Sequence, residues 1–476
     1  METLYSLNRI ISLITFAAVI VFAIPLPVFC AGAKPNVLFI MIDDLRPQLG
    51  CYGFSQMKTP NIDALAKKGA IFTNNFCQAP ICGASRASLL TGIRPTKFRY
   101  IDYDTEADKE APGVTDLPRH FKENGYRTVS IGKIFHFQFD RASSWDVNIR
   151  PNNFENQYVD EDNNKQKTAT GKSVPYEAGT APDSQYFDWK VSENAIAQLK
   201  RSKSKPFFMA VGFSKPHLPY NCPKRFWDKY SDSDLKPATN HFLPINAPKQ
   251  AYHFSEELRE QYVNIPKGES PLGDSLEKKL MHGYYACVSF ADEMVGRVLA
   301  ELDKQNLREN TIIVLWGDHG YQLGEHDMWC KHTLLTTSLR TPLIMSSQKI
   351  KPGTKIDKIT EVLDIYPTLC ELSGINTPAH LDGISMTSLI KEPNIAWKKG
   401  AISRYYRGAS IRTDKYLYAE WRRKIDDVFT ARMLCDLSKD PDENRNVAED
   451  PAYSETVKNL SDLLSSDFDD FSITGK

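Results

Sequence analysis

The apolar segment Asn36-Val37-Leu38-Phe39-Ile40-Met41-Ile42 decides the fold class, and Asp43-Asp44 follow it directly. A run that is apolar at successive positions is typical of a strand buried on both faces, as in a parallel sheet covered by helices. Further runs of this kind recur along the chain, with amphipathic helical patterns between them. We therefore predict an α/β fold with a large, doubly wound, mixed but mostly parallel sheet flanked by helices. The other strands are expected at 127–131, 206–213, 311–316 and 343–345.

Helical patterns fill the stretches between these strands. Gly125 and Gly374 stand just beyond two of them, where a glycine commonly ends a helix. In open sheets of this class, ligands bind at the carboxyl ends of the strands, so functional residues are expected there. The helices are expected at 62–68, 117–123, 192–199, 276–302 and 363–372.

Two regions depart from the alternation of strand and helix. Residues 140–184 are polar, with few aliphatic side chains, and are expected to form a surface insertion. Beyond about residue 390 the pattern changes to short alternating strands at 409–412 and 416–421, and a polar helix is expected at 454–464. We predict a catalytic domain over 34–390 and a smaller C-terminal α+β subdomain with its own small sheet over 391–476.

The 476-residue chain carries no formal net charge, since 59 basic residues balance 59 acidic ones. Such a chain offers no global field for nucleic acid or for an anionic membrane surface, so neither is expected as a partner. An anionic substrate would have to be bound by a local group of cations. The nine cysteines are scattered singly, without a Cys-x-x-Cys pair. This spacing argues against a zinc site and leaves one or two disulfides open, with a pairing that the sequence does not define.

The N-terminus has the features of a targeting segment. Arg9 precedes an apolar run over 10–29, and Ala31 and Ala33 fit the small-residue cleavage pattern. We predict a cleaved signal peptide over 1–33 and a secreted or periplasmic protein. The alternative is an uncleaved membrane anchor, which the prolines at positions 25 and 27 disfavour because they break the helical end of the run.

Acidic side chains follow two of the predicted strands. Asp43 and Asp44 come directly after the first strand, and Asp318-His319 follow the strand at 311–316 after one glycine. Adjacent carboxylates at the end of a buried strand repel one another unless a cation neutralises them. One such pair is most simply explained as the start of a loop, but two pairs at the same edge of the sheet favour a hard divalent cation.

Cys82 is expected at the start of a helix that ends at Thr91-Gly92, with Gly92 as its C-terminal cap. A helix N-terminus has free N–H groups and a dipole that stabilise anions. Taken alone, Cys82 is more simply a small buried apolar residue.

The surrounding motif changes that interpretation. Cys82-x-Ala84-x-Arg86, continued by Ser88-Leu89-Leu90-Thr91-Gly92, resembles the sulfatase signature, in which the cysteine becomes Cα-formylglycine. The chain is thereby identified as a member of the formylglycine-dependent type I sulfatases of the alkaline-phosphatase-like superfamily, most similar to their iduronate-2-sulfatase branch. Ala84 departs from the pattern, since many relatives carry proline there. Further matching motifs are Asp43-Asp44-Leu45-Arg46-Pro47, Gly132-Lys133-Ile134-Phe135-His136, Lys215-Pro216-His217, Gly317-Asp318-His319-Gly320, Gly324-Glu325-His326 with Trp329 and Lys331, and Leu434-Cys435-Asp436-Leu437.

The resemblance implies a function and a set of site residues. It implies hydrolysis of a sulfate ester on a sugar or glycosaminoglycan, with a uronate 2-O-sulfate as the expected substrate. The implied partners are a sulfated carbohydrate and a formylglycine-generating maturation enzyme, without stable membrane association. The implied catalytic residues are Cys82, Arg86 and His136; the implied substrate-binding residues are Lys133, His217 and Lys331; and the implied ligands of a calcium ion are Asp43, Asp44, Cys82, Asp318 and His319.

Three alternatives stay open. The chain could be a sulfatase for another sulfated polysaccharide, such as an algal one, or a phosphoester or phosphonate hydrolase of the same superfamily. The non-enzyme alternative is a glycan-binding pseudo-sulfatase, against which the presence of Cys82, Arg86 and Lys331 argues, since binding alone needs no nucleophile. A uronate would also need a cation for its carboxylate, and Lys215 or Arg412 is expected to supply it.

Overall fold

The computed structural model describes residues 34–152, 158–202, 205–268, 271–422 and 428–469. The predicted signal peptide, 1–33, lies outside the described residues. Within them, none of the helices has the length and apolar character needed to cross a membrane. From Pro35 onward the described residues form one compact unit, and the predicted boundary near residue 390 stays a prediction.

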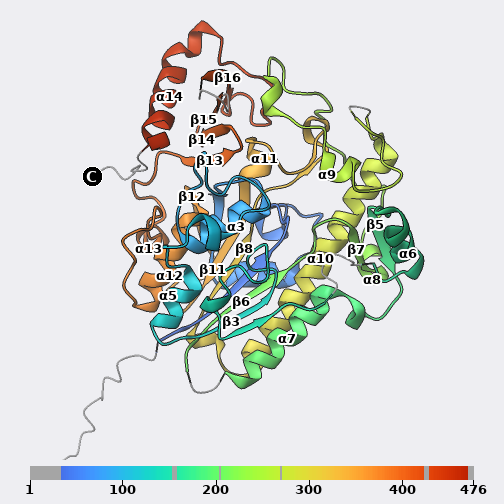
Figure 1. Ribbon diagram of the computed structural model, residues 1–476, viewed down its shortest axis with the longest axis vertical. Coiled ribbons are helices and arrows are strands. Elements are labelled where there is room, and N and C mark those ends of the chain that lie inside the picture. Colours follow the sequence, from blue (N-terminus) through green and yellow to red (C-terminus); the bar gives the residue numbers. More distant parts are fainter. Residues whose placement is uncertain (1–33, 153–157, 203–204, 269–270, 423–427, 470–476) are drawn as a thin grey trace, which may run out of the picture. The chain divides into compact units, whose positions relative to one another are not determined.

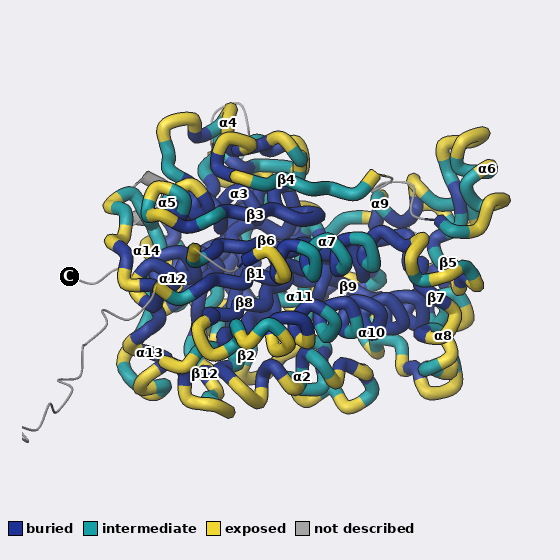
Figure 2. Tube along the Cα trace, turned by 90° about the horizontal axis from the view of Figure 1, so that it is seen from below, coloured by how far each residue is buried: buried dark blue, intermediate teal, exposed yellow. Residues whose placement is uncertain are grey.

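An eight-stranded mixed sheet forms the core (Figure 1). Its central strand β1 (Asn36–Ile42) pairs in parallel with β6 (Phe207–Phe213) and β8 (Thr311–Gly317), and all three are buried along their length. Figure 2 shows these strands in dark blue. The predicted α/β class is therefore confirmed. The full order is β12 (Thr354–Glu361), β2 (Ala70–Phe76), β11 (Arg340–Ser346), β8, β1, β6, β3 (Arg127–Gly132) and β4 (Val147–Ile149).

Three strands of this sheet were not predicted. β2 carries polar residues at its centre, β12 alternates charged and apolar residues at one edge, and β4 is a short strand at the other edge. β12 and β4 are edge strands, which commonly carry polar or charged side chains, whereas β2 lies inside the sheet between β12 and β11. β11, which was predicted, runs antiparallel to both β2 and β8 and makes the sheet mixed.

Helices cover both faces of the sheet and separate two hydrophobic clusters. One cluster joins α3 (Cys82–Thr91), α5 (Leu117–Glu123) and α12 (Ile365–Ser373) to the face that carries Val37 and Phe39. The other cluster joins the opposite face to α2 (Pro60–Lys67), α7 (Phe187–Arg201) and α10 (Asp274–Lys304). All five predicted helices are present, and Gly125 and Gly374 adopt the positive φ expected beyond helix ends.

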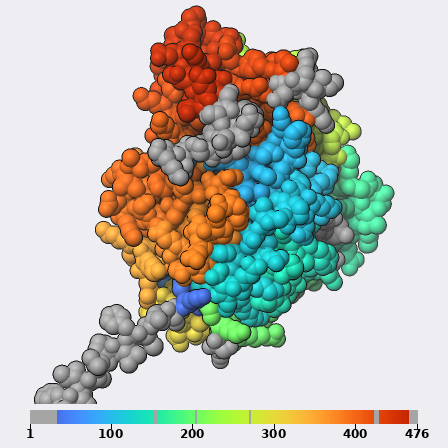
Figure 3. Space-filling view, turned by 60° about the vertical axis from the view of Figure 1, so that its left-hand side comes forward, coloured from blue at the N-terminus to red at the C-terminus, as the bar shows by residue number. Residues whose placement is uncertain are grey.

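The C-terminal part forms a separate four-stranded antiparallel sheet, whose residues are orange and red in Figure 3. α14 (Ser454–Asp469) packs on it through Val457 and Leu460. The small α+β unit predicted from the alternating pattern is thus present. Its strands are β13 (Ala401–Tyr405), β14 (Gly408–Arg412), β15 (Tyr416–Arg422) and β16 (Phe429–Asp436).

The region predicted as a surface insertion, 140–184, contains regular structure. It includes β4 of the large sheet, α6 (Glu161–Thr170) and β5 (Tyr176–Gly179), which pairs in parallel with β7 (Tyr220–Pro223). The remaining short elements are α4 (Ala107–Glu110), α8 (Lys224–Trp227), α9 (Glu256–Arg259), α11 (Thr336–Leu339), α13 (Thr387–Lys391), β9 (Gln322–Leu323) and β10 (Trp329–Cys330).

Candidate active site

The carboxyl ends of β1 and β8 bring the two acidic pairs together. Ile42 is paired with Gly317, so the residues that follow each strand are neighbours. The backbone N–H of Asp44 donates to Asp318 Oδ1 at 3.0 Å. Asp43, Asp44, Asp318 and His319 are fully buried, and one ligand atom of each lies within 4.8 Å of the others. The juxtaposition expected from the strand ends is therefore present.

The chemistry of these four side chains fits a divalent cation. His319 Nδ1 lies 2.9 Å from the carbonyl oxygen of Gly320, which can only accept, so Nδ1 carries the hydrogen. Nε2 then faces the carboxylates, 3.4 Å from Asp44 Oδ1, and is buried without a hydrogen-bond partner. Burial would lower the pKa of His319, but the charge of Asp318 helps to raise it to about 9. Burial raises the pKa of Asp318 to about 6. A histidine nitrogen without a hydrogen-bond partner, beside three carboxylates, is a set of ligand atoms that suits a divalent cation.

Cys82 occupies the first position of α3, as predicted, and Gly92 ends the helix with a φ of 73°. Its Sγ lies 3.2 Å from His136 Nδ1 and belongs to a second ligand group with Asp43 and His319. Burial would raise the pKa of the Cys82 thiol, but Lys133 and His136 lower it well below its ordinary value. The site is thus built to stabilise negative charge at this position.

Arg86 lies one turn further along α3 and holds the acidic residues in place. Its Nε donates to Asp318 Oδ2 at 2.8 Å, and its Nη2 lies 3.4 Å from Asp43 Oδ1. Its Nη1 donates to the carbonyl oxygens of Lys133 and Ile134 at 2.5 and 3.1 Å. The guanidinium is fully buried, so it positions other groups and does not face the solvent.

Lys133, His217 and Lys331 converge on the two aspartates after β1. Lys133 Nζ lies 2.5 Å from Asp43 Oδ2, and Lys331 Nζ lies 2.9 Å from Asp44 Oδ1. His217 Nε2 lies 3.9 Å from Asp44 Oδ2, while its Nδ1 donates to the carbonyl of Leu218. Both lysines are almost fully buried, which is unusual for lysine and indicates that they serve this site.

A close approach of two backbones places Lys133. A Cβ added to Gly212, on β6, would lie 1.9 Å from the carbonyl oxygen of Lys133. Glycine at this position therefore permits β6 to run directly beside the end of β3, from which Lys133 extends.

Glu257 was not predicted from the sequence. Its Oε1 accepts from Lys331 Nζ at 3.0 Å and lies 3.3 Å from His217 Nε2. Asp44, His217 and Glu257 form a further potential ligand group, but the Lys331 ammonium contacts both carboxylates and takes the place of a second cation. No signal in the sequence marks Glu257, because the segment 255–259 resembles an ordinary charged surface helix and reaches the site only through the fold.

Of the two cations expected for a uronate carboxylate, Lys215 donates to backbone carbonyls, whereas Nε and Nη1 of Arg412 have no hydrogen-bond partner among the described residues. Lys215 Nζ donates to the carbonyls of His217 and Pro219 at 3.0 and 2.6 Å, so it braces the loop that carries His217. Arg412 lies over the ring of Phe76, with 5.7 Å between the guanidinium carbon and the ring centroid. Neither contact directs a charge toward Cys82.

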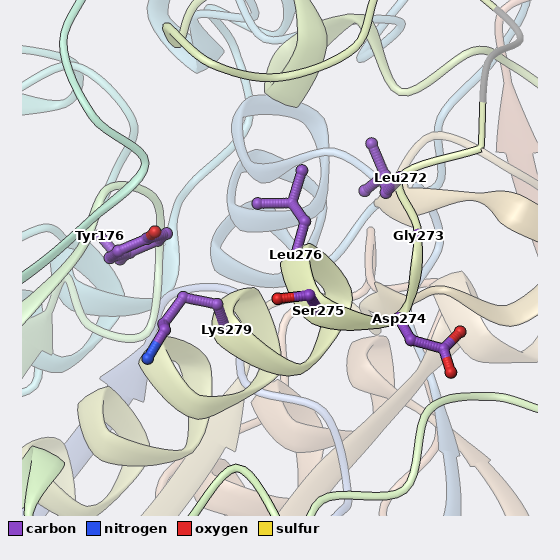
Figure 4. A pocket seen from close by; sticks show the side chains of 7 residues that line it. All are labelled: Tyr176, Leu272, Gly273, Asp274, Ser275, Leu276 and Lys279. Carbon is purple, nitrogen blue, oxygen red and sulfur yellow. The ribbon is translucent and has the colours of Figure 1, made fainter.

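Glu325, His326 and Trp329, which matched the family motif near Lys331, are held by contacts within the chain, and Glu325 and His326 also line a pocket of about 430 Å³. Glu325 Oε1 lies 2.7 Å from Arg46 Nη2, and His326 Nε2 lies 3.0 Å from the carbonyl of Asp442. Trp329 is fully buried. A pocket of about 440 Å³ at the start of α10, lined by Tyr176, Asp274 and Lys279 among others, contains none of the predicted site residues (Figure 4).

All eight cysteines of the described residues are free thiols, so no disulfide is present among them. Among these eight, Cys82 alone belongs to a potential ligand group with Asp43 and His319.

Comparison with known proteins defines the class. Residues 35–375 match the sulfatase family model, and residues 324–469 match the model described as N-sulphoglucosamine sulphohydrolase, C-terminal. The chain belongs to the sulfatase family. It is a sulfuric ester hydrolase, and a sulfated carbohydrate substrate fits this family.

Individual relatives support this assignment. Iduronate 2-sulfatase of Mus musculus is 33% identical over 385 residues, which cover 72% of this chain and 69% of that protein. A sulfatase of Formosa agariphila is 31% identical over 465 residues, covering 90% of this chain and 86% of that protein. A solved structure of a protein in complex with its substrate D-glucosamine-2-N,6-O-disulfate superposes with a TM-score of 0.75 at 22% identity, covering 93% and 100% of the two chains. At that identity the superposition shows the shared fold.

Proposed function

We propose that this sulfatase removes the 2-O-sulfate from a terminal uronic acid of a glycosaminoglycan-type sugar. The observation that carries the proposal is the convergence of Lys133, His217 and Lys331 on Asp43 and Asp44, near Cys82, which supports a site for the anionic sulfate group. The uronate is supported by the likeness to iduronate 2-sulfatase, at 33% identity.

We propose further that Cys82 is converted to formylglycine by a maturation enzyme. The hydrated aldehyde would supply one hydroxyl to attack sulfur and a second whose deprotonation expels sulfate, which a serine or cysteine alone could not do. His136 Nδ1, 3.2 Å from Cys82 Sγ, is placed to hold or move a proton at that position. The low pKa of the Cys82 thiol supports a site that stabilises an oxyanion there.

The surrounding residues would bind the sulfate and release the alcohol. Each lysine ammonium has three donors, so Lys133 and Lys331 can contact a sulfate oxygen while still holding Asp43 and Asp44. His217 Nε2 faces the cluster, and its side chain is 26% exposed, so it can hold a proton for the leaving alcohol. Asp43, Asp44, Asp318 and His319, with the side chain at position 82, would hold calcium. That ion, when bound, would supply Lewis-acid stabilisation of the charge that develops on the sulfate oxygens.

The experiment compares sulfated substrates under equal conditions, after peptide mass spectrometry has established whether Cys82 carries an aldehyde or its hydrate. A 2-sulfated uronate disaccharide is expected to have a kcat/KM at least tenfold above that of 6-sulfated glucosamine, a difference of about 1.4 kcal/mol in transition-state binding. Preference for the hexosamine by that factor would contradict the uronate proposal. An unmodified Cys82 in fully active protein would contradict the formylglycine proposal.

A further inference from the structure

The Glu257 carboxylate lies beside the cations that the proposed function assigns to sulfate, yet the reaction does not use it. Its Oε1 contacts Lys331 Nζ at 3.0 Å and His217 Nε2 at 3.3 Å. Its Oε2 has no hydrogen-bond partner among the described residues, and His332 Nε2 lies 3.8 Å away, beyond hydrogen-bond distance. One oxygen of this partly buried carboxylate is therefore enclosed without a donor among the described residues, a polar group that a ligand could satisfy.

A carboxylate at this place works against the binding of an anion. Like charges repel most strongly in a buried site, where water screens them little. Lys331 does not need Glu257 for neutralisation, because Asp44 already accepts from its ammonium through both oxygens, at 2.9 and 3.1 Å. A second carboxylate is therefore best explained by something in the substrate other than its sulfate group.

Aromatic rings form a wall next to this free oxygen. The His332 imidazole is stacked on the ring of Tyr405, with 5.8 Å between centroids and 14° between planes. Tyr406, which is 49% exposed, makes an edge contact with Tyr405, with 4.7 Å between the two ring centroids. The side chains of His217, Glu257 and His332 are 26%, 12% and 20% exposed, so each is partly accessible to solvent, although Oε2 of Glu257 is itself enclosed. An apolar wall beside one oriented polar group is the usual design of a small-molecule subsite.

We propose that Glu257 is a specificity residue whose Oε2 accepts a hydrogen bond from the hydroxyl next to the sulfate ester, while His332 and Tyr405 border the sugar ring. The inference rests on the proposed function and names the substrate feature that the site selects. A sulfate held by His217 and Lys331 lies directly beside Glu257, since both nitrogens also contact its Oε1. The nearest donor on a sulfated sugar is then the hydroxyl of the adjacent ring carbon. A second sulfate at that carbon would meet the carboxylate and be rejected.

The test measures three variants on three substrates. The variants are Glu257→Ala, Glu257→Gln and the control Glu256→Ala, in which the neighbouring carboxylate is 61% exposed. The substrates are p-nitrophenyl sulfate, a 2-sulfated uronate disaccharide, and the same disaccharide with hydrogen in place of the adjacent hydroxyl. Thermal melting establishes that each variant is folded.

Glu257→Ala is expected to lower kcat/KM on the disaccharide about thirty- to a hundredfold, as for loss of one hydrogen bond to a charged group. On p-nitrophenyl sulfate and on the deoxy disaccharide, neither of which offers the hydroxyl, any loss reports only the contacts of Oε1 with Lys331 and His217, and it should be at least about tenfold smaller than the loss on the disaccharide. Glu257→Gln should recover part of the loss, since its amide oxygen can still accept, and Glu256→Ala should behave as wild type.

Equal losses on all three substrates would overturn the proposal, because they would mean that Glu257 only positions Lys331. Equal wild-type rates on the two disaccharides would overturn it as well. Wild-type protein that hydrolyses p-nitrophenyl sulfate but neither disaccharide would contradict the proposed uronate substrate, and the Glu257 proposal would fail with it.

Discussion

Around Cys82, each buried carboxylate is matched with a cation. Asp43 faces Lys133, Asp44 faces Lys331, and Asp318 faces Arg86. Burial would raise the pKa of Asp43, but Lys133, His217 and Arg86 lower it well below its ordinary value. Removal of one member leaves an uncompensated charge in the interior, which costs more than the pair itself contributes. Substitutions here should therefore keep the shape and the hydrogen bonds of the side chain, so that the loss of charge is not joined by a cavity and unpaired polar groups.

Asp318→Asn follows that rule and tests the cation site. The amide oxygen can still accept from Arg86 Nε, so the fold should persist, whereas loss of a charged ligand should lower the calcium content and reduce kcat at least about a hundredfold. Metal analysis and activity are measured together, with the exposed Asp414→Asn as the control. Unchanged activity after complete chelation would refute the calcium assignment.

Glu443 gives a prediction about the pH dependence of stability. It is buried, and its Oε2 accepts from the backbone N–H of Thr336 at 2.9 Å. Burial raises the pKa of Glu443 from 4.5 to about 7. Between these values the folded chain keeps a proton that the unfolded chain has released, so this residue makes stability fall as the pH rises through that window.

Glu443→Gln mimics the protonated form at every pH. It should match wild type in stability near pH 4.5 and exceed it by roughly 1–3 kcal/mol at pH 8. Urea unfolding at the two pH values measures this difference, with the exposed Glu309→Gln as the control. An equal change at both pH values would show that the effect does not come from ionisation.

Among single helices and strands, the sequence predicted the bounds best where one local feature, a capping glycine or an apolar run, determines them. α3 begins and ends at the predicted residues because Gly92 fixes its end, and β1 and β8 follow from their apolar runs. β2 and β12 could not be predicted, since their pairing depends on each other and on β11. Glu257 was missed for the same reason, because only the path of the chain brings α9 to the site.

Gly212→Ala tests how two elements jointly place Lys133. The new Cβ would meet the Lys133 carbonyl at 1.9 Å, so the end of β3 must shift and move the ammonium away from Asp43. We expect a loss of about 1–3 kcal/mol in stability and more than about tenfold in kcat/KM. Gly113→Ala, with open space around its Cβ, is the control. Wild-type activity in Gly212→Ala would contradict this account.

Across the whole molecule, a buried ion network joins the large sheet to the C-terminal sheet. Glu361, at the end of β12, accepts from Arg94 Nη2 at 2.6 Å and from Lys398 Nζ at 2.5 Å. The same carboxylate accepts from the backbone N–H of Ile402, on β13, at 3.0 Å. Sequence patterns predicted that both sheets exist, though not all of their strands. The connection between the sheets depends on contacts of Glu361 with residues distant in sequence and on burial that no local pattern reveals.

Glu361→Ala should therefore lower the free energy of unfolding of the whole protein, because it affects both sheets. It leaves the guanidinium of Arg94 and the ammonium of Lys398 buried without this partner, which typically costs about 3–5 kcal/mol.

Burial would raise the pKa of Glu361, but Arg94 and Lys398 lower it well below 4.5. The contribution of Glu361 is consequently complete above about pH 4.5 and declines as the pH falls below it. Chemical unfolding at pH 7 and pH 3.5 should show a larger difference from wild type at pH 7, while the exposed Glu392→Ala should show little at either. A loss of the same size at both pH values would mean that Glu361 acts through packing and not through its charge.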